Sequence, residues 1–370
     1  MAEKQSRRLL RSDEPEVELD PAKSVEFGGE LYWVVGETAG GAPYGLTWAE
    51  YREATRDDGS QAGWARAKRL MRRALTVTDG TEPEVGRVVH IGQGLSRDAY
   101  AAEVESGAGA RRLVVLLPRA SDPERDRRTH HEAHLLARLA PLARGFRVPR
   151  PIALLPTPHG LALVREQVDG IPAGLRAGRM HGVTPWALVA ELAAAVHAVP
   201  IDALGELRGH ATRRAHGEAQ LAALAELERD AEPQIRTALA WLHDHLPPDE
   251  PSVLLHGDLL GPNILLPVLA EPGTPPALID WEFARRGDPA HDLAIVTRGV
   301  RKPFQQVDGF ERLLRDYRES SSRDIHPHEV RFQELRLLLR LYGAQENRSV
   351  RGQYLQQVRI VLEQVQSRGG

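Results

Sequence analysis

Three polar side chains in the second half of the chain have the types and spacing needed for chemistry on a phosphate group. Asp258 and Asn263 lie five residues apart in a loop between apolar runs, and Asp280 follows the short apolar run 277–279. A phosphoryl group in transfer carries charge that metal ions and fixed donors must offset, so carboxylate and amide oxygens have to converge on one point. The sequence therefore predicts that short strands bring these three side chains together.

The segments around these residues support this interpretation. Residues 264–266 and 277–279 are predicted to form two short strands, which return the chain and deliver Asp280 beside the loop. The step of five is also that of a kinase catalytic loop, in which the Asp takes the proton of the attacking hydroxyl and the Asn holds Mg²⁺. The alternative is that Asp258 and Asn263 are ordinary turn residues, as members of Asp, Asn, Gly and Pro clusters usually are.

The catalytic segment resembles that of a known family. It reads L-L-H-G-D-L-L-G-P-N-I-L-L from Leu254, followed by L-I-D-W-E and G-D-P-A-H-D-L-A. These motifs are similar to those of the aminoglycoside phosphotransferase and choline kinase-like family of small-molecule kinases, in which His-Gly-Asp stands where protein kinases have His-Arg-Asp. The resemblance extends from about Gly86 to the C-terminus.

The resemblance implies a role for each matching residue. Asp258 would be the catalytic base and His256 of the same loop a further catalytic residue, while Asn263 and Asp280 would bind Mg²⁺. Asp292 would be the buried carboxylate that braces this loop. Its alternative is an acidic residue in the first turn of a helix, where the helix dipole favours a negative charge.

The family's fold is α+β, a two-lobed protein kinase-like fold. A small antiparallel sheet forms its N-terminal lobe, and its C-terminal lobe is mainly helical. This chain adds an N-terminal extension. We therefore expect a disordered, charge-rich tail at 1–20, the extension at 21–84, the N-lobe at 85–168, and the helical C-lobe with the catalytic loop at 169–370.

The extension has secondary-structure signals of its own. Leu31–Val35 is predicted to be a strand, Thr47 and Glu50 form a capping box for a helix, and a second helix carries Leu70 and Leu75. Three tryptophans are expected to form a small core within the extension, with a ligand surface as the alternative: Trp33, Trp48 and Trp64.

A glycine turn opens the predicted N-lobe. Strands are predicted at 88–91 and 99–104, with Gly92, Gly94 and Ser96 between them. Glycines let backbone N–H groups approach a phosphate where a side chain would block it, and the family places its phosphate loop here. Taken alone, the two glycines fit a plain hairpin better than a phosphate loop.

The next strand, 112–117, precedes a helix on which Glu132 lies on the apolar stripe with Leu136 and Leu139. In kinases such a Glu pairs with a strand lysine that binds the α- and β-phosphates, and the alternative is a Glu that reaches solvent. The resemblance puts Leu116 where the family has Lys or Arg. Arg119 and Arg112 are the substitutes that the sequence suggests.

The connection between the lobes follows a strand at 161–164. Backbone groups of Glu166 to Val168 would hold the base of ATP or GTP, as the resemblance implies. His197, after an alanine-rich helix, is expected to be a structural residue. The remaining helices of the C-lobe are predicted at 187–197, 218–229, 233–246, 310–319, 330–341 and 354–365.

The amino-acid composition limits the kinds of binding partner that are expected. The net charge is −3 and 42 % of the residues are hydrophobic, which indicates a globular protein without the basic footprint of nucleic-acid or membrane-surface binding. Cysteine is absent, which excludes disulfides and thiolate metal sites, and no apolar run approaches 18 residues. The cytoplasm, where ATP is available, is the expected compartment.

Three functions remain open from the sequence. The first is an ATP- or GTP-dependent, Mg²⁺-dependent kinase acting on a hydroxyl of an antibiotic, sugar or amino alcohol. The second, favoured by Leu116, is a catalytically weak pseudokinase or ligand-binding protein of the same fold. A protein kinase is disfavoured because no A-P-E segment follows Asp280. Charge counts along the C-lobe do not identify the acceptor.

Overall fold

The computed structural model describes residues 24–27, 30–37, 43–47, 60–79, 82–94, 96–107, 109–175, 183–229, 232–267 and 273–366. Contacts within the chain divide it into two units, Met1–Arg56 and Asp57–Gly370. The first unit contains an antiparallel sheet in the order β1 (Ser24–Phe27), β2 (Glu30–Glu37) and β3 (Pro43–Thr47). The predicted strand 31–35 is therefore part of β2. The predicted helix after Thr47 lies outside the described residues.

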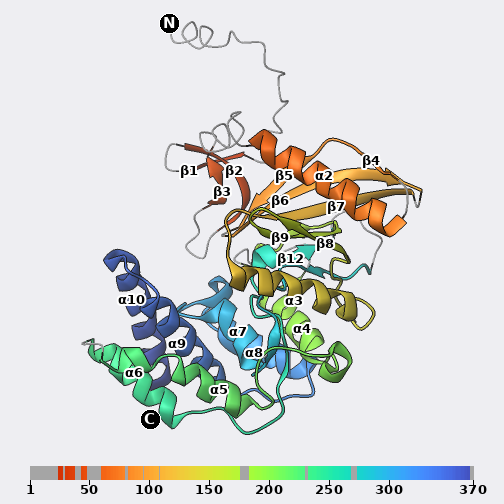
Figure 1. Cartoon of the computed structure of the whole chain (residues 1–370). Coiled ribbons are helices and arrows are strands. Elements are labelled where there is room, and N and C mark those ends of the chain that lie inside the picture. Colours follow the sequence, from red (N-terminus) through yellow and green to blue (C-terminus); the bar gives the residue numbers. More distant parts are fainter. Residues whose placement is uncertain are drawn as a thin grey trace, which may run out of the picture. The chain divides into compact units, whose positions relative to one another are not determined.

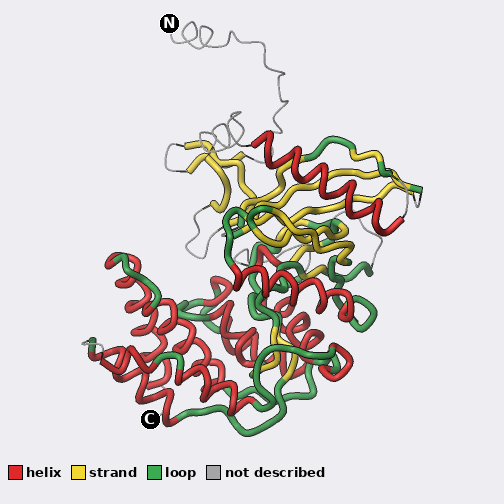
Figure 2. Tube along the Cα trace, viewed as in Figure 1, coloured by secondary structure: helices red, strands yellow, loops and turns green. Residues whose placement is uncertain are grey.

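The second unit contains a six-stranded antiparallel sheet (Figures 1 and 2). Its strands are β4 (Glu84–Val85), β5 (Val89–Gln93), β6 (Arg97–Ser106), β7 (Gly109–Pro118), β8 (Pro151–Thr157) and β9 (Gly160–Glu166). The order is β4-β6-β7-β9-β8, with β5 also paired to β6. These strands form the antiparallel sheet of the N-lobe that the sequence predicts.

One face of this sheet is covered by α2 (Ser60–Asp79), which runs across the strands in Figure 1. Met71 and Leu75 of this helix are completely buried, in one apolar cluster with Leu113, Val115 and Val164. These three sheet residues lie on β7 and β9, where alternate side chains point to the same face. Helix α2 therefore forms half of the hydrophobic core around the sheet.

The structure divides the chain earlier than the sequence-based boundary at residue 84. That boundary separates α2 from the strands on which it packs, whereas the contacts place the division between Arg56 and Asp57. Trp64 packs against this same sheet cluster rather than in a core confined to the extension. The side chains of Trp33 and Trp48 lie outside the described residues. The apolar spacing of α2 predicts the helix but not the surface that it covers.

The opposite face of the sheet is covered by α3 (Pro123–Leu139), which Asp122 caps through a hydrogen bond from the Glu124 backbone N–H. Ala133 of this helix packs in an apolar cluster with Leu116 and Leu163 of the sheet. The sheet is therefore enclosed between two helices, and residues that alternate along β6, β7 and β9 face α3.

The C-lobe is mainly helical, as expected from the sequence (Figure 2). Its helices are α4 (Pro185–His197), α5 (Arg213–Ala222), α6 (Pro233–Asp244), α7 (Ala290–Thr297), α8 (Gly309–Ser320), α9 (Pro327–Gly343) and α10 (Arg348–Gln366). Short 3-10 turns occur at Ile201–Leu204, Ala225–Arg229, Gly261–Asn263 and Pro303–Gln305. Helix α5 begins five residues before the predicted 218, because the Thr212 side chain caps it by accepting the Ala215 N–H.

Two small sheets organise the catalytic segment within this lobe. Strand β12 (Ile264–Leu266) pairs with β13 (Ala277–Leu278) and with β10 (Ile171–Pro172). The β12–β13 pair is the predicted hairpin, with Ile264 opposite Leu278. Strand β11 (Val253–Leu255) pairs with β14 (Arg285–Gly287), so the chain before the catalytic loop is tied to the chain after Asp280.

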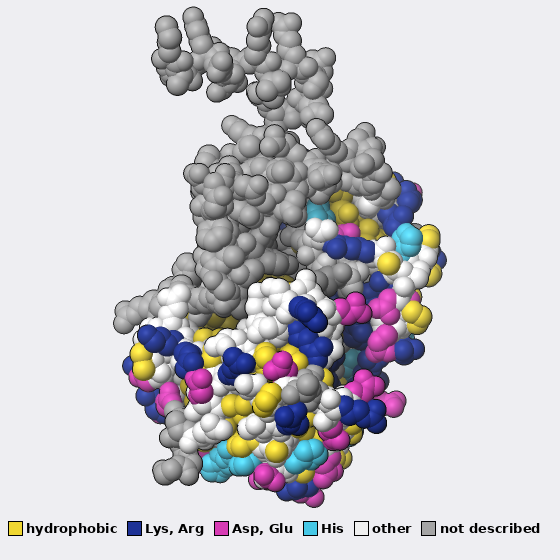
Figure 3. Space-filling view, turned by 90° about the vertical axis from the view of Figure 1, so that its left-hand side faces the viewer, with side chains coloured by type: hydrophobic (Ala, Val, Ile, Leu, Met, Phe, Trp, Pro, Cys, Tyr) yellow, Lys and Arg dark blue, Asp and Glu magenta, His cyan; other side chains and the backbone are white. Residues whose placement is uncertain are grey.

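The surface carries charges of both signs. On the face seen in Figure 3, Lys and Arg side chains are interspersed with Asp and Glu over the described part of the molecule, in agreement with the small net charge of −3. None of the described helices is long and apolar enough to cross a membrane.

Candidate active site

A buried carboxylate, that of Asp292, binds the backbone of the catalytic loop. Asp292, in the first turn of α7, accepts hydrogen bonds from the backbone N–H groups of His256 at 2.8 Å and Gly257 at 2.9 Å. Burial alone would raise the pKa of Asp292, but the hydrogen bond from His197 and the neighbouring donors lower it. Both alternatives left open by the sequence therefore apply: Asp292 is a first-turn acid, and it binds the loop backbone.

His197 and His256 both have structural partners. Nδ1 of His197 lies 2.9 Å from the Tyr317 hydroxyl, and its Nε2 lies 3.3 Å from Asp292. Nε2 of His256 lies 3.1 Å from the Ile279 carbonyl, which can only accept, while its Nδ1 lies 3.3 Å from the Asp258 N–H. The His256 tautomer that satisfies both contacts is neutral and protonated at Nε2. The ring thus fixes the loop rather than facing a substrate.

Gly257 is the residue that distinguishes this loop from His-Arg-Asp, and the structure gives a reason for glycine there. Its φ is +82°, and a Cβ on its backbone would lie 2.4 Å from the carbonyl oxygen of Phe283. Any larger residue would both strain the backbone and collide with the chain after Asp280. The loop can approach that segment closely only because position 257 lacks a side chain.

Asp258 and Asn263 meet across the turn as the spacing of five predicts. The side-chain N–H₂ group of Asn263 donates to the Asp258 carboxylate and to its backbone carbonyl, both at 2.9 Å. Burial raises the pKa of Asp258, and the charge of nearby Asp280 adds to the rise. A carboxylate with a raised pKa binds a proton more readily than an exposed one, which suits a general base.

Asp280 is delivered by β13 in an unusual backbone conformation. The Ile279 N–H donates to the Asn263 carbonyl at 3.0 Å, so the two candidate metal residues are joined through their strands. The φ of Asp280 is +66°, a left-handed value that costs a residue with a side chain about 1 kcal/mol or more. Such strain is retained where the surrounding contacts over-determine it, and it motivates the assignment of Asp280 to a functional site.

The buried partner of Glu132 is Arg97, at the start of β6. Glu132 is completely buried on α3, and Nη1 of Arg97 donates to its carboxylate at 2.7 Å. Nη2 of the same arginine donates to Asp280 at 2.9 Å. Burial alone would raise the pKa of Glu132, but the charges of Arg97 and of Arg165 lower it. One arginine therefore joins the N-lobe helix to the candidate metal carboxylate of the C-lobe.

The substitutes suggested by the sequence occupy other places. Arg119 pairs with Asp98 at 2.8 Å, and Arg112 pairs with Asp169. Leu116 packs in the apolar cluster between the sheet and α3, so its slot holds no cation. Neither arginine is in contact with Glu132, and the expectation that Arg119 contributes to the phosphate site has no support in this geometry.

The register of the sheet explains why Arg97 can supply the cation that is absent at Leu116. Arg97 is opposite Pro118 and Ala99 is opposite Leu116, so all four side chains point to the α3 face. Ala99 is small and leaves room for the long guanidinium of Arg97. The signal in the sequence was an arginine directly after the glycine turn, two residues before an alanine on the same face. Sequence reasoning missed it because it considered only the strand that usually carries the cation.

A second buried arginine lies on the same face. Arg165 of β9 is 7 % exposed, and its Nε and Nη1 have no hydrogen-bond partner among the described residues. It is opposite Val114 in the sheet, and its charge helps to lower the pKa of Glu132. Burial lowers the pKa of Arg165 itself. Arg165 therefore adds a second buried positive charge next to Glu132.

Some of the backbone groups predicted to bind the nucleotide already have hydrogen-bond partners within the protein. The Gly94 N–H donates to the Arg97 carbonyl at 2.8 Å, and the Ser96 carbonyl accepts from Arg119, so this part of the turn is a closed hairpin. Gly92 is opposite Ala99 in the pairing of β5 with β6, and a Cβ added to it would meet nothing within 4 Å, so no close contact requires glycine there. In the lobe connection, the Glu166 N–H is bonded to Arg150, whereas Val168 has no backbone partner among the described residues.

Two side chains could hold a divalent cation here. The amide oxygen of Asn263 and one carboxylate oxygen of Asp280 remain free of the hydrogen bonds that fix each residue. Mg²⁺ prefers oxygen ligands and commonly takes only one or two from the protein, with waters and substrate phosphates completing its shell. The donor set therefore fits Mg²⁺. Within the described ranges, no group of three or more His, Asp or Glu side chains is arranged to hold a metal by itself.

Solved structures share this architecture. A macrolide 2'-phosphotransferase type I is 23 % identical, with a TM-score of 0.55 over 79 % of this chain and 96 % of its own. The macrolide 2'-phosphotransferase of Brachybacterium faecium, an apoenzyme, is 24 % identical, with a TM-score of 0.53 over 78 % of this chain and 97 % of its own. A GDP complex of aminoglycoside 2'-phosphotransferase-IIIa is 14 % identical, with a TM-score of 0.57 over 80 % and 99 %. These likenesses show the kinase-like fold.

The sequence itself identifies the family. No curated protein sequence matches this chain significantly. The family model of the phosphotransferase enzyme family matches residues 87–340. This match covers more than half of the chain, from just before β5 into α9, and it includes the loop of Asp258, the strand that delivers Asp280, and Arg97. The chain therefore belongs to the phosphotransferase enzyme family.

Proposed function

We propose that this protein is a small-molecule kinase, which transfers the γ-phosphoryl group of ATP or GTP to a hydroxyl of an antibiotic, sugar or amino alcohol. The observation that carries the proposal is the contact of Arg97 with both Glu132 and Asp280, next to the Asp258–Asn263 pair. This arrangement assembles a base, metal-binding oxygens and a buried cation at one point between the lobes. Those are the groups that phosphoryl transfer requires.

In the proposed mechanism, Asp258 orients the acceptor hydroxyl and takes its proton. The hydrogen bond from Asn263 fixes one carboxylate oxygen, which leaves the other to face the acceptor. Arg97 offsets charge on the nucleotide phosphates while Glu132 holds it in place. Mg²⁺, held by Asn263 and Asp280, would supply the electrostatic stabilisation of the transferring phosphate. A cytoplasmic location would supply the nucleotide.

The competing proposal is a catalytically weak pseudokinase of the same fold. It depended on the absence of a cation from the slot of Leu116. Arg97 supplies a buried cation from the adjacent strand and pairs with the expected glutamate at 2.7 Å. The geometry therefore favours turnover, and the pseudokinase becomes an outcome of the activity test.

The test is nucleotide diphosphate release against a panel of hydroxylated acceptors, with ATP and GTP in parallel. Macrolides and aminoglycosides come first on the panel, because proteins that act on them share this fold. Asp258→Asn should lower kcat at least a hundredfold and leave nucleotide affinity nearly unchanged, since the base acts on the acceptor. The matched control is Asp244→Asn, on the exposed surface of α6.

Two results would count against the proposal. If the parent protein releases no diphosphate with any acceptor although it binds MgATP or MgGTP, the pseudokinase is the better description. A near-normal kcat in Asp258→Asn would instead reject the base while leaving the kinase in place. The control should behave like the parent in both measurements.

A further inference from the structure

A second pocket, which we call the arginine pocket, has several arginines in its lining and lies away from the Asp258–Asn263 pair. It has a volume of about 560 Å³ and lies between α5, α9, the start of α3 and the segment after Asp280. Among the described residues that line it, five are arginines and two are glutamates. Three of the arginines matter most for its chemistry: Arg285 of β14, and Arg336 and Arg340 of α9.

Arg336 is buried without a carboxylate partner. It is 3 % exposed, and its Nε has no hydrogen-bond partner within the described part of the chain. Its Nη2 contacts Nδ1 of His291 at 2.6 Å and the side-chain oxygen of Gln333 at 3.2 Å. Both partners are uncharged, because burial lowers the pKa of His291 far below its usual range. A buried charge without an opposite charge is costly and uncommon in proteins.

The neighbouring cations increase this cost. Burial and the charges of Arg285 and Arg340 lower the pKa of Arg336. Arg285 donates through Nε to the Phe283 carbonyl at 3.2 Å. Over the residues that the structure describes, no ion pair joins Arg285, Arg336 or Arg340 to an acidic side chain. Three guanidinium groups thus face one pocket, and their charges repel one another.

The two glutamates of the pocket already pair with other arginines. Glu282 lies 3.5 Å from Nε of Arg128 and 3.7 Å from Nη2 of Arg97. Glu124 is paired with Arg127 and, at 3.3 Å, with Arg208. Both carboxylates are therefore paired with other arginines, and neither is paired with the three arginines of α9 and β14.

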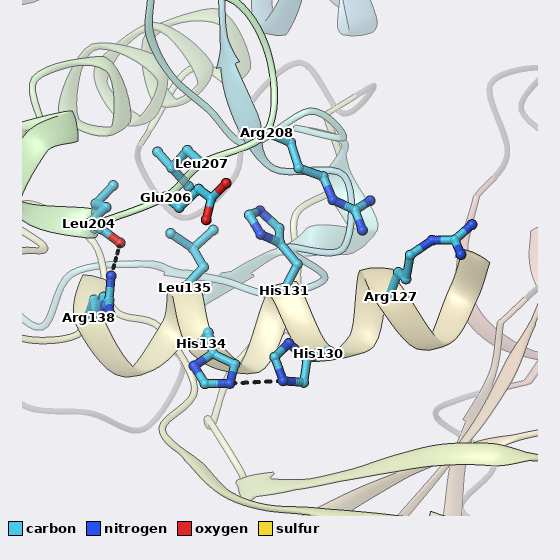
Figure 4. A pocket seen from close by; sticks show the side chains of 10 residues that line it. All are labelled: Arg127, His130, His131, His134, Leu135, Arg138, Leu204, Glu206, Leu207 and Arg208. Carbon is cyan, nitrogen blue, oxygen red and sulfur yellow. Dashed lines mark hydrogen bonds between the residues drawn. The ribbon is translucent and has the colours of Figure 1, made fainter. Parts of the chain in front are cut away.

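In an adjacent pocket the arginines already have oxygen acceptors (Figure 4). It lies between α3 and the segment 204–208, with His131 and Leu135 pointing toward that segment and His130 and His134 on the other side of the helix. Arg138 donates to the Leu204 carbonyl at 2.9 Å. Arg127 and Arg208 share Glu124. Because its arginines have acceptors already, this pocket gives no reason to expect an anion.

We propose that the arginine pocket binds a small phosphate-bearing molecule, inorganic phosphate or a phosphomonoester, through Arg285, Arg336 and Arg340. Guanidinium groups bind phosphate oxygens through paired, charge-assisted hydrogen bonds, and a phosphate dianion offers enough oxygens and charge for several of them. The volume of about 560 Å³ exceeds that of phosphate alone and leaves room for an organic group.

Binding there would act on the segment that leaves the candidate active site. Arg285 begins β14, which pairs with β11 just before the catalytic loop, with Leu255 opposite Arg285. The pocket is also lined by Phe283, whose carbonyl lies against Gly257. An anion that removes the repulsion among these cations should therefore stabilise the whole chain and this segment in particular.

The test is thermal unfolding of the full chain with increasing inorganic phosphate at constant ionic strength. Saturating MgADP is present throughout, so that phosphate subsites for the nucleotide are filled. The melting temperature of the parent should rise and saturate. Arg340→Ala, on the exposed end of the cluster, and Arg336→Met should each need at least tenfold more phosphate for the same rise, because each removes a charged donor. Arg127→Ala, in the adjacent pocket, should respond like the parent.

Each shift is measured from that variant's own melt without phosphate, so a change in basal stability does not affect the comparison. Ribose 5-phosphate should reproduce the rise and ribose should not, which identifies a phosphomonoester as a ligand. The proposal is overturned if the parent shows no saturable rise, if the rise is unchanged in Arg340→Ala and Arg336→Met, or if it appears only without MgADP.

Discussion

Replacing Arg97 with Met tests the electrostatic link between the lobes. Arg97 is 7 % exposed and Glu132 is fully buried, so the variant leaves a carboxylate in the core without its hydrogen-bonded partner. Removing one member of a buried ion pair costs about 3 to 5 kcal/mol of folding free energy. Because Arg165 still lies near Glu132, we expect a value near the lower end, about 3 kcal/mol. That is a large part of the stability of a typical domain.

The assay is urea unfolding of the parent, Arg97→Met, Glu132→Leu and the double variant. The double variant removes both charges together and replaces them with apolar side chains, so it should be more stable than Arg97→Met, but less stable than the parent because Arg165 loses the carboxylate that offsets its charge. The control is Arg119→Met, on the neighbouring strand end. Arg119 pairs with partly exposed Asp98 and should cost less than about 1 kcal/mol.

The stability loss caused by Arg97→Met should depend on pH. Because Arg97 lowers the pKa of Glu132, the pair stabilises the parent above the unfolded pKa of Glu, and this stability is lost as the pH falls through the folded pKa. The penalty of Arg97→Met should therefore be largest at neutral pH and shrink in acid. The reasoning is refuted if Arg97→Met is no less stable than the double variant, or if its penalty does not change with pH. Loss of Arg97 should also weaken MgATP binding about ten- to a hundredfold, the value of a buried charged hydrogen bond.

Three further outcomes are expected. Because burial raises the pKa of Asp258, kcat should decrease as the pH is lowered, with an apparent pKa above that of an ordinary carboxylate; an apparent pKa at the ordinary value contradicts this. For the same reason, Asp258→Asn should be more stable than the parent at pH 7 but not in acid. A chain that begins at Glu84 lacks α2 and should be insoluble, whereas one that begins at Asp57 should fold and bind nucleotide; equal solubility would show that α2 is dispensable. Gly257→Ala places a Cβ 2.4 Å from the Phe283 carbonyl at φ +82° and should cost about 2 kcal/mol or more, and a melt like that of the parent would contradict the close approach.

The parts of the site that the sequence predicts are local. Asp258 and Asn263 face each other because they are separated by one turn, and the pairing of β12 with β13 depends on two short apolar runs with a break between them. The helices follow from apolar periodicity over ten or more residues, which a single sequence shows directly. For these features, the residues that decide the structure lie next to one another in the chain.

The features that the sequence did not predict depend on pairing at a distance. Arg97 reaches Glu132 across 35 residues and Asp280 across 183, and its position is decided by the register of β6 against β7. Helix α2 belongs to the N-lobe because of the sheet face that it covers, which its own amphipathic pattern does not specify. An amphipathic helix shows that it needs an apolar partner, and only the assembled sheet shows which one.

Arg97, and not a residue at position 116, supplies the cation next to Glu132, which shows that the fold constrains the place of the charge rather than the strand that carries it. Glu132 and Asp280 need one positive charge between them, within hydrogen-bond distance of both. Several positions on the same sheet face can supply it, because adjacent antiparallel strands are about 5 Å apart and an arginine side chain is longer than that spacing. A lysine is shorter and presents no planar fork, so from the start of β6 it could not bridge both carboxylates as Arg97 does. The apolar residue at 116 and the arginine at 97 are therefore linked: once the cation comes from β6, a charge at 116 would face a cluster of Ala101, Ala133 and Leu163 with its carboxylate partner already neutralised.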